Sequence, residues 1–425
     1  MKGYSKYRET GLPWLPHIPA HWAWRMLSQT GKEQQIRNLN DHDYPVLSLS
    51  YGNIIRKKNI ELGLVPSNYD NYQIVHAGNI ILRLTDLQND HKSLRTGLVQ
   101  EDGIITSAYT CIKSTENPAF IHYVLHVYDM KKIFYGMGGG VRQSIAYKDI
   151  RNMMLPVPPR EEQDQIACYL DWQSSRINKQ INAKKKQITL LELLKQKVID
   201  DLLPHEGNCA LGRLIVNIES GTSVNSESGS AQEKDFGILA TSCVYGNVFH
   251  VEENKKVIES EHSRVKCNVR EGTLIISRMN TPSLVGSCGY SKKTYPNIYL
   301  PDRLWQVTLK SSLLPEFAWR YLSSSRVQSW FASIATGSSS TMKNITKGQL
   351  RALMISCPSV KEQQAIVDNI NKQEIRIQCY VDCIKRQVAL LEEYCACLIT
   401  EVVTGQIDVR DVTVPNRSKA EGASQ

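Results

Sequence analysis

Side chains able to pair with the edges of nucleic-acid bases are concentrated in two parts of the sequence. The first is RLTDLQNDHKSLRTGLV (83–99), and the second is ISRMNTPSLVG (276–286) with YLPDRLWQV (299–307). Arginine pairs with guanine, and asparagine or glutamine with adenine, through two hydrogen bonds in the major groove. We expect DNA contacts in or near these stretches from Arg83, Gln88, Asn89, His91, Lys92, Arg95, Arg278, Asn280, Lys292, Lys293, Arg303 and Trp305. The alternative is that Asp86 and Asp302 hold neighbouring arginines in structural salt bridges.

Two glycine- and serine-rich loops lead into basic, polar segments, GMGGGVRQSIAYKDI (136–150) and TGSSSTMKNITKGQL (336–350). Neither contains the phosphate-binding pattern GxxxxGK[ST], and Val141 interrupts a dinucleotide fingerprint. A flexible backbone beside amide and guanidinium donors suits a close approach to DNA. We expect contacts from Arg142, Gln143, Ser144, Lys148, Lys343, Asn344 and Lys347. A surface loop that simply leads into a helix stays open as the alternative.

The net charge of +9 is unevenly distributed. Residues 1–160 contain 19 basic and 13 acidic side chains, and residues 204–358 contain 17 and 12. The segments 161–203 and 359–403 have no excess of positive charge. The excess therefore lies where a polyanion would be held.

The sequence lacks the residue sets of a self-contained enzyme. PVPPR (156–160) has neither the acid nor the aromatic residue of a [DN]PP[FYW] methyltransferase motif, and we find no phosphate loop, GxSxG elbow or nuclease cluster. The 11 cysteines form no CxxC knuckle and are predicted to be reduced and mostly buried. His122 and His126 lack the glutamate of HExxH and are predicted to pack or lie at the surface rather than bind metal. We expect no catalytic residue, metal site or cofactor in this chain.

Membrane insertion and export are not indicated. No run approaches the roughly 18 apolar residues of a membrane span. The N-terminus, MKGYSKYRET, has no apolar stretch of the kind found in a signal peptide. We expect a cytoplasmic protein without membrane contacts.

Two long amphipathic helices are predicted over 158–203 and 358–403. Each is free of internal glycine and proline, and Ser359 with Glu362 forms a capping box at the second start. Pro204 and Gly405 end them. Apolar residues recur in steps of four and three, which is typical of a coiled-coil seam. The predicted seam is Leu170, Ile177, Ile181, Ile188, Leu191, Val198, Leu202, Ile370, Ile377, Val381, Ile384, Val388, Leu391, Leu398 and Val402.

An internal repeat relates the two halves of the chain. The two halves align at an offset of 200 residues, and no gap is needed between Ile145 and Glu192. Identical residues recur at many positions of this range, the first being Ile145 with Ile345 and the last Glu192 with Glu392. We predict an α/β or α+β fold of two globular domains, 1–157 and 204–357, with a C-terminal tail at 404–425. The apolar stripe of each helix needs a partner, so we expect an antiparallel intramolecular coiled coil with a pseudo-two-fold. The alternative is that each helix packs only on its own domain.

These motifs together resemble the specificity subunit of type I restriction-modification enzymes. The resemblance covers residues from about 8 to 409 and rests on GLPWLPHIPAHW, TDLQNDHKSLRTGLV, GIITSAY, GGGVRQSI, PVPPREEQDQI, SRMNTPSLVG, LPDRLW and CPSVKEQQAI. It departs from the family where Cys357 and a single proline replace the first PxPP, and where TGSSSTMKNI replaces GGGVRQSI.

The resemblance implies two target-recognition domains, each reading half of a bipartite, asymmetric double-stranded DNA target. It implies that the helices fix the gap between the halves and dock two methyltransferase subunits, with restriction subunits joining the complex. S-adenosylmethionine, ATP and magnesium would belong to those partners, and this chain would be non-catalytic. The competing interpretation is a coiled-coil scaffold that binds proteins without reading DNA.

Overall fold

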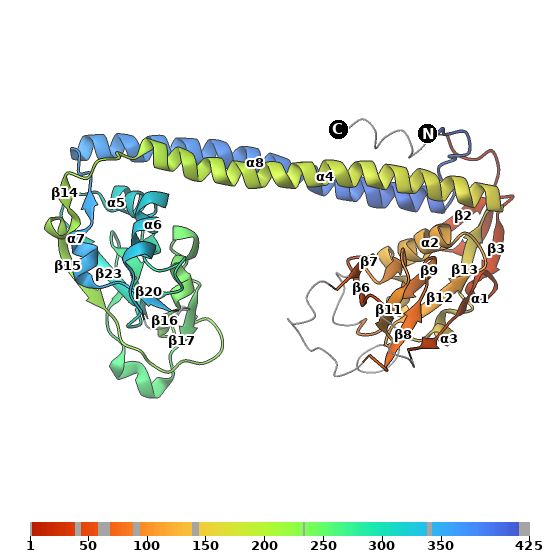
Figure 1. The fold of residues 1–425 in the computed structure, drawn as a ribbon, viewed down its shortest axis with the longest axis horizontal. Helices are drawn as coiled ribbons and strands as arrows, with labels where there is room; N and C mark the ends of the chain where they lie inside the picture. The colour runs from red at the N-terminus through yellow and green to blue at the C-terminus, as the bar shows by residue number, and fades with distance from the viewer. Residues whose placement is uncertain are drawn as a thin grey trace. The chain divides into compact units, whose positions relative to one another are not determined.

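The computed structural model describes residues 2–38, 44–57, 69–87, 94–137, 144–232, 234–337 and 342–415. The chain forms two compact units, Met1–Ala183 with Gln387–Gln425, and Lys184–Arg386. Each unit contains one globular domain and part of both long helices (Figure 1).

The two long helices predicted by the apolar periodicity are present as α4 (Arg160–Leu202) and α8 (Val360–Val403). At 1.5 Å per residue each is about 65 Å long. The capping box at the start of α8 is confirmed, because Glu362 N donates to Ser359 Oγ and Ser359 N donates to Glu362 Oε2. Gly405 ends α8 with a left-handed φ of 72°, and Gln406 N donates to Glu401 O.

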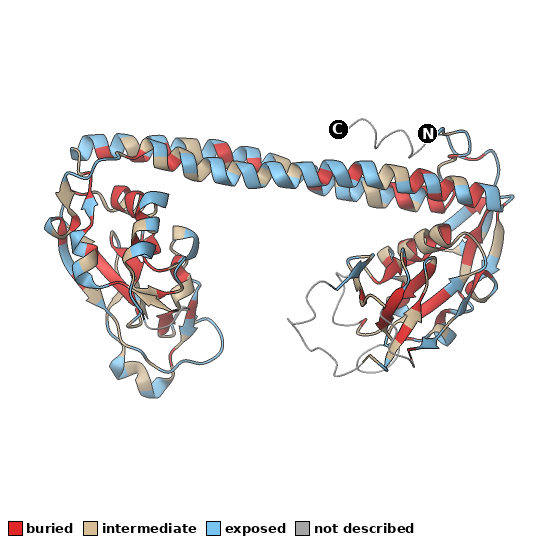
Figure 2. Ribbon diagram, viewed as in Figure 1, coloured by how far each residue is buried: buried red, intermediate tan, exposed pale blue. Residues whose placement is uncertain are grey.

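Within each unit the two long helices lie side by side. In unit 1 the start of α4 packs with the end of α8, and Cys395 Sγ lies 3.9 Å from Ser174 Oγ. In unit 2 the end of α4 meets the start of α8, where Lys195 Nζ lies 3.7 Å from Glu374 Oε1. All 15 predicted seam residues are buried or half-buried. Buried and half-buried positions recur along both long helices in Figure 2.

The globular domain of unit 1 is built on small antiparallel sheets. Its central sheet has the order β10-β9-β12-β4, and α2 (Pro118–Met130) packs on β9 and β10. The strands of the central sheet are β4 (Gly31–Glu33), β9 (Asn79–Leu82), β10 (Thr96–Leu98) and β12 (Thr110–Ser114). The surrounding strands are β1 (Tyr7–Leu12), β2 (Leu15–Pro19), β3 (Ala23–Met26), β5 (Ile36–Arg37), β6 (Leu47–Ser50), β7 (Asn53–Arg56), β8 (Tyr72–Val75), β11 (Gly103–Thr106) and β13 (Met154–Val157).

The globular domain of unit 2 repeats this plan. Its antiparallel sheet has the order β15-β23-β19-β21, formed by β15 (Ile215–Ser220), β19 (Leu274–Ser277), β21 (Cys288–Tyr290) and β23 (Leu304–Leu309). A second sheet contains β17 (Asn254–Lys256), β16 (Gly237–Leu239), β22 (Tyr295–Tyr299) and β18 (Asn268–Val269). Two short pairs complete it, β14 (Cys209–Ala210) with β25 (Met354–Ile355) and β20 (Met279–Asn280) with β24 (Lys343–Asn344).

The expected mixed α/β fold is confirmed. The helical segment that begins at Pro315 in the second domain is divided into α5 (Pro315–Leu322) and α6 (Ser325–Ile334). Ser324 begins the second helix as its N-cap, because its side chain accepts a hydrogen bond from Val327 N.

Candidate nucleic-acid interface

Two motifs far apart in the sequence of the second domain meet through a short strand pair. In the β20–β24 pair, Met279 lies opposite Asn344 and Asn280 opposite Lys343. One residue beyond β24, Ile345 N donates to Arg278 O over 2.9 Å. This pairing joins SRMN to the basic end of the 336–350 loop.

A hollow of 360 Å³ lies beside this strand pair. It is lined by Ser220, Arg278, Asp302, Trp305, Asn344, Ile345, Thr346 and Lys347. Arg278 Nε donates to the backbone oxygen of Asp302 over 2.7 Å, which fixes the guanidinium, and 29% of its side chain stays exposed. Lys347 is exposed and its Nζ donates to Ile218 O. Arg278 Nη2 also lies 3.8 Å from Asp302 Oδ2, which is the salt bridge named as the alternative for this arginine. The hollow thus presents Lys347, an amide and an arginine paired with a carboxylate, and its cations and amide are groups that contact phosphates and base edges.

Asn344 supplies the amide of the hollow. Its Oδ1 atom is buried and has no hydrogen-bond partner among the described residues. An acceptor without a partner is uncommon in a protein interior.

The predicted DNA contact of Arg95 is wrong. Arg95 is 0% exposed, and its guanidinium donates to the backbone oxygens of Arg83, Thr85 and Asp86 at 2.7–3.2 Å. Its Nε donates to Tyr135 Oη. Arg95 therefore stabilises the turn that follows β9 from inside the domain.

The predicted DNA contacts of Asn280 and Trp305 are also wrong, because both side chains are buried. Asn280 is 6% exposed, its Nδ2 donates to Ser277 Oγ, and its Oδ1 accepts from Thr281 N. Trp305 is 3% exposed and belongs to the hydrophobic core of the second domain. Asn280 holds a turn and Trp305 forms a wall of the hollow.

Three exposed cations of the second domain lie outside the lining of this hollow. Lys292 and Lys293 follow β21, and Tyr290 pairs with Leu274 at the start of β19, whereas Arg278 follows its end. The structure therefore places the two lysines at the opposite end of the sheet. Arg303 lines an adjacent hollow of 210 Å³, which shares Asp302 with the first.

The first domain has a corresponding arrangement. Ile145 N donates to Leu84 O over 3.0 Å, as Ile345 N does to Arg278 O, so the basic segment again meets the end of the central strand. Arg83 is half-buried there, and Ser144 and Lys148 are exposed. The remaining predicted contacts, Gln88, Asn89, His91, Lys92, Arg142 and Gln143, lie outside the described residues.

Sequence reasoning missed Ser220 and Thr346 as lining residues. Thr346 begins α7 (Lys347–Ala352) with a capping box, in which its Oγ1 accepts from Gln349 N and Gln349 Oε1 accepts from Thr346 N. The spacing TxxQ is a local signal that would have placed Thr346 at a helix start beside Lys347. Ser220 enters through strand pairing with Trp305, which leaves no local signal.

Titratable side chains elsewhere in the part of the chain that the structure describes do not gather into a metal site. Among the described residues no group of three or more His, Cys, Asp or Glu side chains could hold a metal ion. Burial lowers the pKa of His122 to about 3 and that of His126 to about 4, so both pack as neutral side chains. All 11 cysteines are free, but only Cys111, Cys243 and Cys288 are buried, which corrects the expectation of mostly buried thiols. In the described ranges, no helix combines the length and apolar character needed to cross a membrane.

Comparisons with known proteins point to one family. Residues 215–377 match the model of the type I restriction modification DNA specificity domain. The specificity subunit of the type I restriction enzyme EcoKI from Escherichia coli K12 is 28% identical over 260 residues, 55% of this chain and 52% of that protein. The Escherichia coli EcoEI specificity subunit is 24% identical over 212 residues, which cover 47% and 36%. The matches span about half the length of these relatives or less.

A solved structure shares the fold. A chain from a study of the assembly and conformational transition of the type I R-M system aligns with a TM-score of 0.65 and 16% identity, over 92% of this chain and 99% of that one. The family match and the two curated relatives confirm the resemblance to specificity subunits of type I restriction-modification enzymes that the sequence motifs indicated.

Proposed function

We propose that this chain reads DNA as the specificity subunit of a type I restriction-modification complex. The domains 1–157 and 204–357 each read one half of a bipartite target. The observation that carries this proposal is the β20–β24 pair, which gathers Arg278, Asn344 and Lys347 around one hollow. The corresponding contact between Ile145 and Leu84 supports the same use of the first domain.

The gap between the half-sites is set by α4 and α8 as one antiparallel coiled coil. Two contacts support a single register: Ser174 with Cys395 in unit 1, and Lys195 with Glu374 in unit 2. A shift of 200 residues converts Ser174 to Glu374 and Cys395 to Lys195. The two contacts are therefore equivalent under the internal repeat, as expected for one helix pair with a pseudo-two-fold.

The helices also dock two methyltransferase subunits. In unit 2, Leu190 and Tyr380 are 55% and 54% exposed and line an apolar groove of 450 Å³ with Gln187, Leu191, Leu194 and Ile384. In unit 1 the repeat positions of Leu190 and Leu194 are the exposed Leu390 and Tyr394, whereas those of Tyr380 and Ile384 are Gln180 and Lys184. Apolar surface of this kind is typical of a protein interface. The exposed apolar pair at positions 190 and 194 therefore occurs once in each repeat, at Leu190 with Leu194 and at Leu390 with Tyr394, which suits two copies of the same partner.

A titration of the full chain with and without its methyltransferase partner tests the proposal. We expect binding to one bipartite duplex to sharpen when the partner is added, and to weaken steeply with salt because phosphate contacts release counterions. The scaffold interpretation would be favoured instead if the chain bound its protein partner with an affinity that does not change with salt and did not discriminate between duplexes.

A further inference from the structure

A buried glutamine joins each long helix to the globular domain that precedes it. Gln163 is 1% exposed and Gln363 is 0% exposed, and they occupy the same position four residues into α4 and α8. Both lie in the helix-start motif that the chain contains twice.

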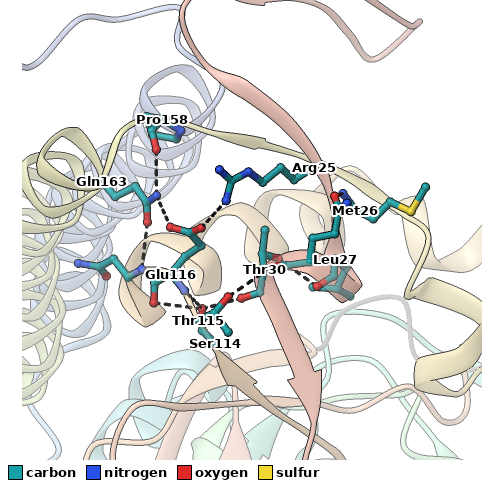
Figure 3. Close-up of polar contacts among 11 residues, drawn as sticks. Arg25, Met26, Leu27, Thr30, Ser114, Thr115, Glu116, Pro158 and Gln163 are labelled. Carbon is teal, nitrogen blue, oxygen red and sulfur yellow. Dashed lines mark hydrogen bonds and ion pairs between the residues drawn. The ribbon is translucent and has the colours of Figure 1, made fainter.

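In unit 1 the Gln163 amide contacts both the helix entrance and the domain (Figure 3). Its Nε2 donates to Pro158 O over 2.9 Å and to Glu116 Oε2 over 2.8 Å. Its Oε1 accepts from Asn117 N, the N-cap of α2, over 2.9 Å. Glu116 is in turn held by Arg25 Nη1.

In unit 2 the Gln363 amide makes the corresponding contacts. Its Nε2 donates to Pro358 O over 2.8 Å and to Ser312 O over 2.9 Å. Its Oε1 accepts from Leu314 N, the N-cap of α5, over 2.8 Å. In both units the glutamine thus donates to the backbone oxygen of the proline five residues before it. In both it also accepts from the N-cap N–H of the helix that packs on the domain sheet.

Each glutamine replaces half of a capping box. The N-cap N–H of a helix is often bound by a Glu or Gln side chain at N3 of the same helix. In α2 and α5 that position is taken by Phe120 and Phe317, which are fully buried in the domain cores. The acceptor is instead supplied by the long helix, so capping the domain helix requires one relative orientation of the two elements.

Apolar contacts alone would fix this orientation less sharply. Ile166 and Leu170 of α4 share a hydrophobic core with Phe120. Burial of apolar surface is non-directional, whereas a hydrogen bond weakens steeply as its angle departs from linearity. The amide therefore restricts the rotation and sliding that the apolar contact tolerates.

We propose that Gln163 and Gln363 are positioning residues that hold each recognition domain at one angle to its helix, and so make DNA binding selective for a single gap length. This inference rests on the proposed function. The glutamines act through the domains and do not contact DNA.

The test measures gap selectivity in the full chain assembled with its methyltransferase partner. Competition titrations use three duplexes, with the gap of the target and with gaps one base pair shorter and longer. Gln163→Met and Gln363→Met keep the side-chain length and remove the amide. We expect each to reduce the preference for the correct gap at least tenfold. Gln364→Met is the matched control, since Gln364 is exposed and donates only to Asp368 on its own helix, and it should keep the preference.

A purely structural role would give a different result. Unchanged preference in both methionine variants, or an equal loss of affinity for all three duplexes, would overturn the inference while leaving the proposed function intact. If a methionine variant fails to fold, Gln363→Asn keeps the amide but shortens its reach, and the same loss of preference is expected. A wild-type complex indifferent to the gap would overturn the proposed function itself.

Discussion

The indole Nε1 of Trp22 donates a hydrogen bond to Oε1 of Glu162 over 3.0 Å, and Glu162 is only 6% exposed. The same carboxylate accepts from the Tyr4 hydroxyl, and its Oε2 lies 2.8 Å from His21 Nε2. Burial and the bond to Glu162 raise the pKa of Tyr4 well above its usual range, so Tyr4 remains a donor. Glu162 thereby ties the N-terminal segment to the first turn of α4. Its repeat counterpart Glu362 is exposed and only caps α8.

These two glutamates predict unequal losses of stability. Glu162→Ala should lower the free energy of unfolding by about 3 kcal/mol, because the Trp22 and Tyr4 donors stay buried without an acceptor. Glu362→Ala removes part of a surface cap and should cost about 1 kcal/mol. Urea unfolding of the full chain, followed by circular dichroism, measures both. Equal losses would contradict the different roles assigned to the repeated position.

The parts of the fold that the sequence could predict are those with local signals. The long helices follow from apolar periodicity without glycine or proline, and the start of α8 follows from Ser359 and Glu362. The pairing of β20 with β24 joins two-residue strands more than 60 positions apart, and no periodic pattern can reveal it. The division between α5 and α6 depends on Ser324, the middle residue of three consecutive serines, which is the N-cap of α6.

The candidate site shows the same limit at the level of side chains. Arg278, Asn344 and Lys347 were expected from their types and do line one hollow. Arg95 has the same chemical type, yet it satisfies three backbone oxygens in the interior. A guanidinium suits a DNA base or a buried turn equally well, so residue type alone does not separate these roles.

Lys347→Ala tests the proposed DNA contact in the second domain. Loss of one phosphate contact should weaken binding to all sequences alike and reduce the slope of log affinity against log salt by about 1. Fluorescence titration at several salt concentrations measures the slope. Lys310→Ala is the control, because Lys310 is exposed at the other end of β23 and should leave the slope unchanged. Identical slopes in the two variants would exclude Lys347 from the interface.

His122 and His126 predict a loss of stability in mild acid. Burial holds their pKa values near about 3 and about 4, below about 6.5 in an unfolded chain. The unfolded state therefore binds more protons, so the stabilisation is present above about pH 6.5 and is lost as the pH falls. Between about pH 7 and 5.5, protonation of the two residues in the unfolded state should reduce the free energy of unfolding by about 2 kcal/mol. Urea unfolding measures the change in the free energy of unfolding between the two pH values, and this change should be smaller in the double variant His122→Gln and His126→Gln. If the change were the same in the variant, other titrating groups would be its cause.

The helix ruler predicts that gap length follows helix length. Deleting residues 181–187 and 382–388 together removes one heptad from each helix and keeps the seam in register. Seven residues at 1.5 Å correspond to about 10 Å, or about 3 base pairs of DNA. Selection of methylated sites from a randomised duplex pool should recover a shorter gap. Deleting residues 181–187 alone misaligns the seam and should reduce stability. An unchanged gap in the paired deletion would show that the helices do not set the spacing of the half-sites.

Leu190 and Leu390, exposed at equivalent positions of the repeat, predict one methyltransferase subunit for each repeat. Leu190→Lys and Leu390→Lys place a charge on surfaces now 55% and 58% exposed, so the isolated chain should fold normally. Each variant should lose one copy of the partner, and the double variant should lose both, because burying an unpaired charge in an interface is strongly unfavourable. Native mass spectrometry counts the copies directly. Leu193→Glu is a matched control, since Leu193 is 63% exposed and its repeat position already carries Glu393. Binding of two copies to the double variant would place the docking surface elsewhere on the chain.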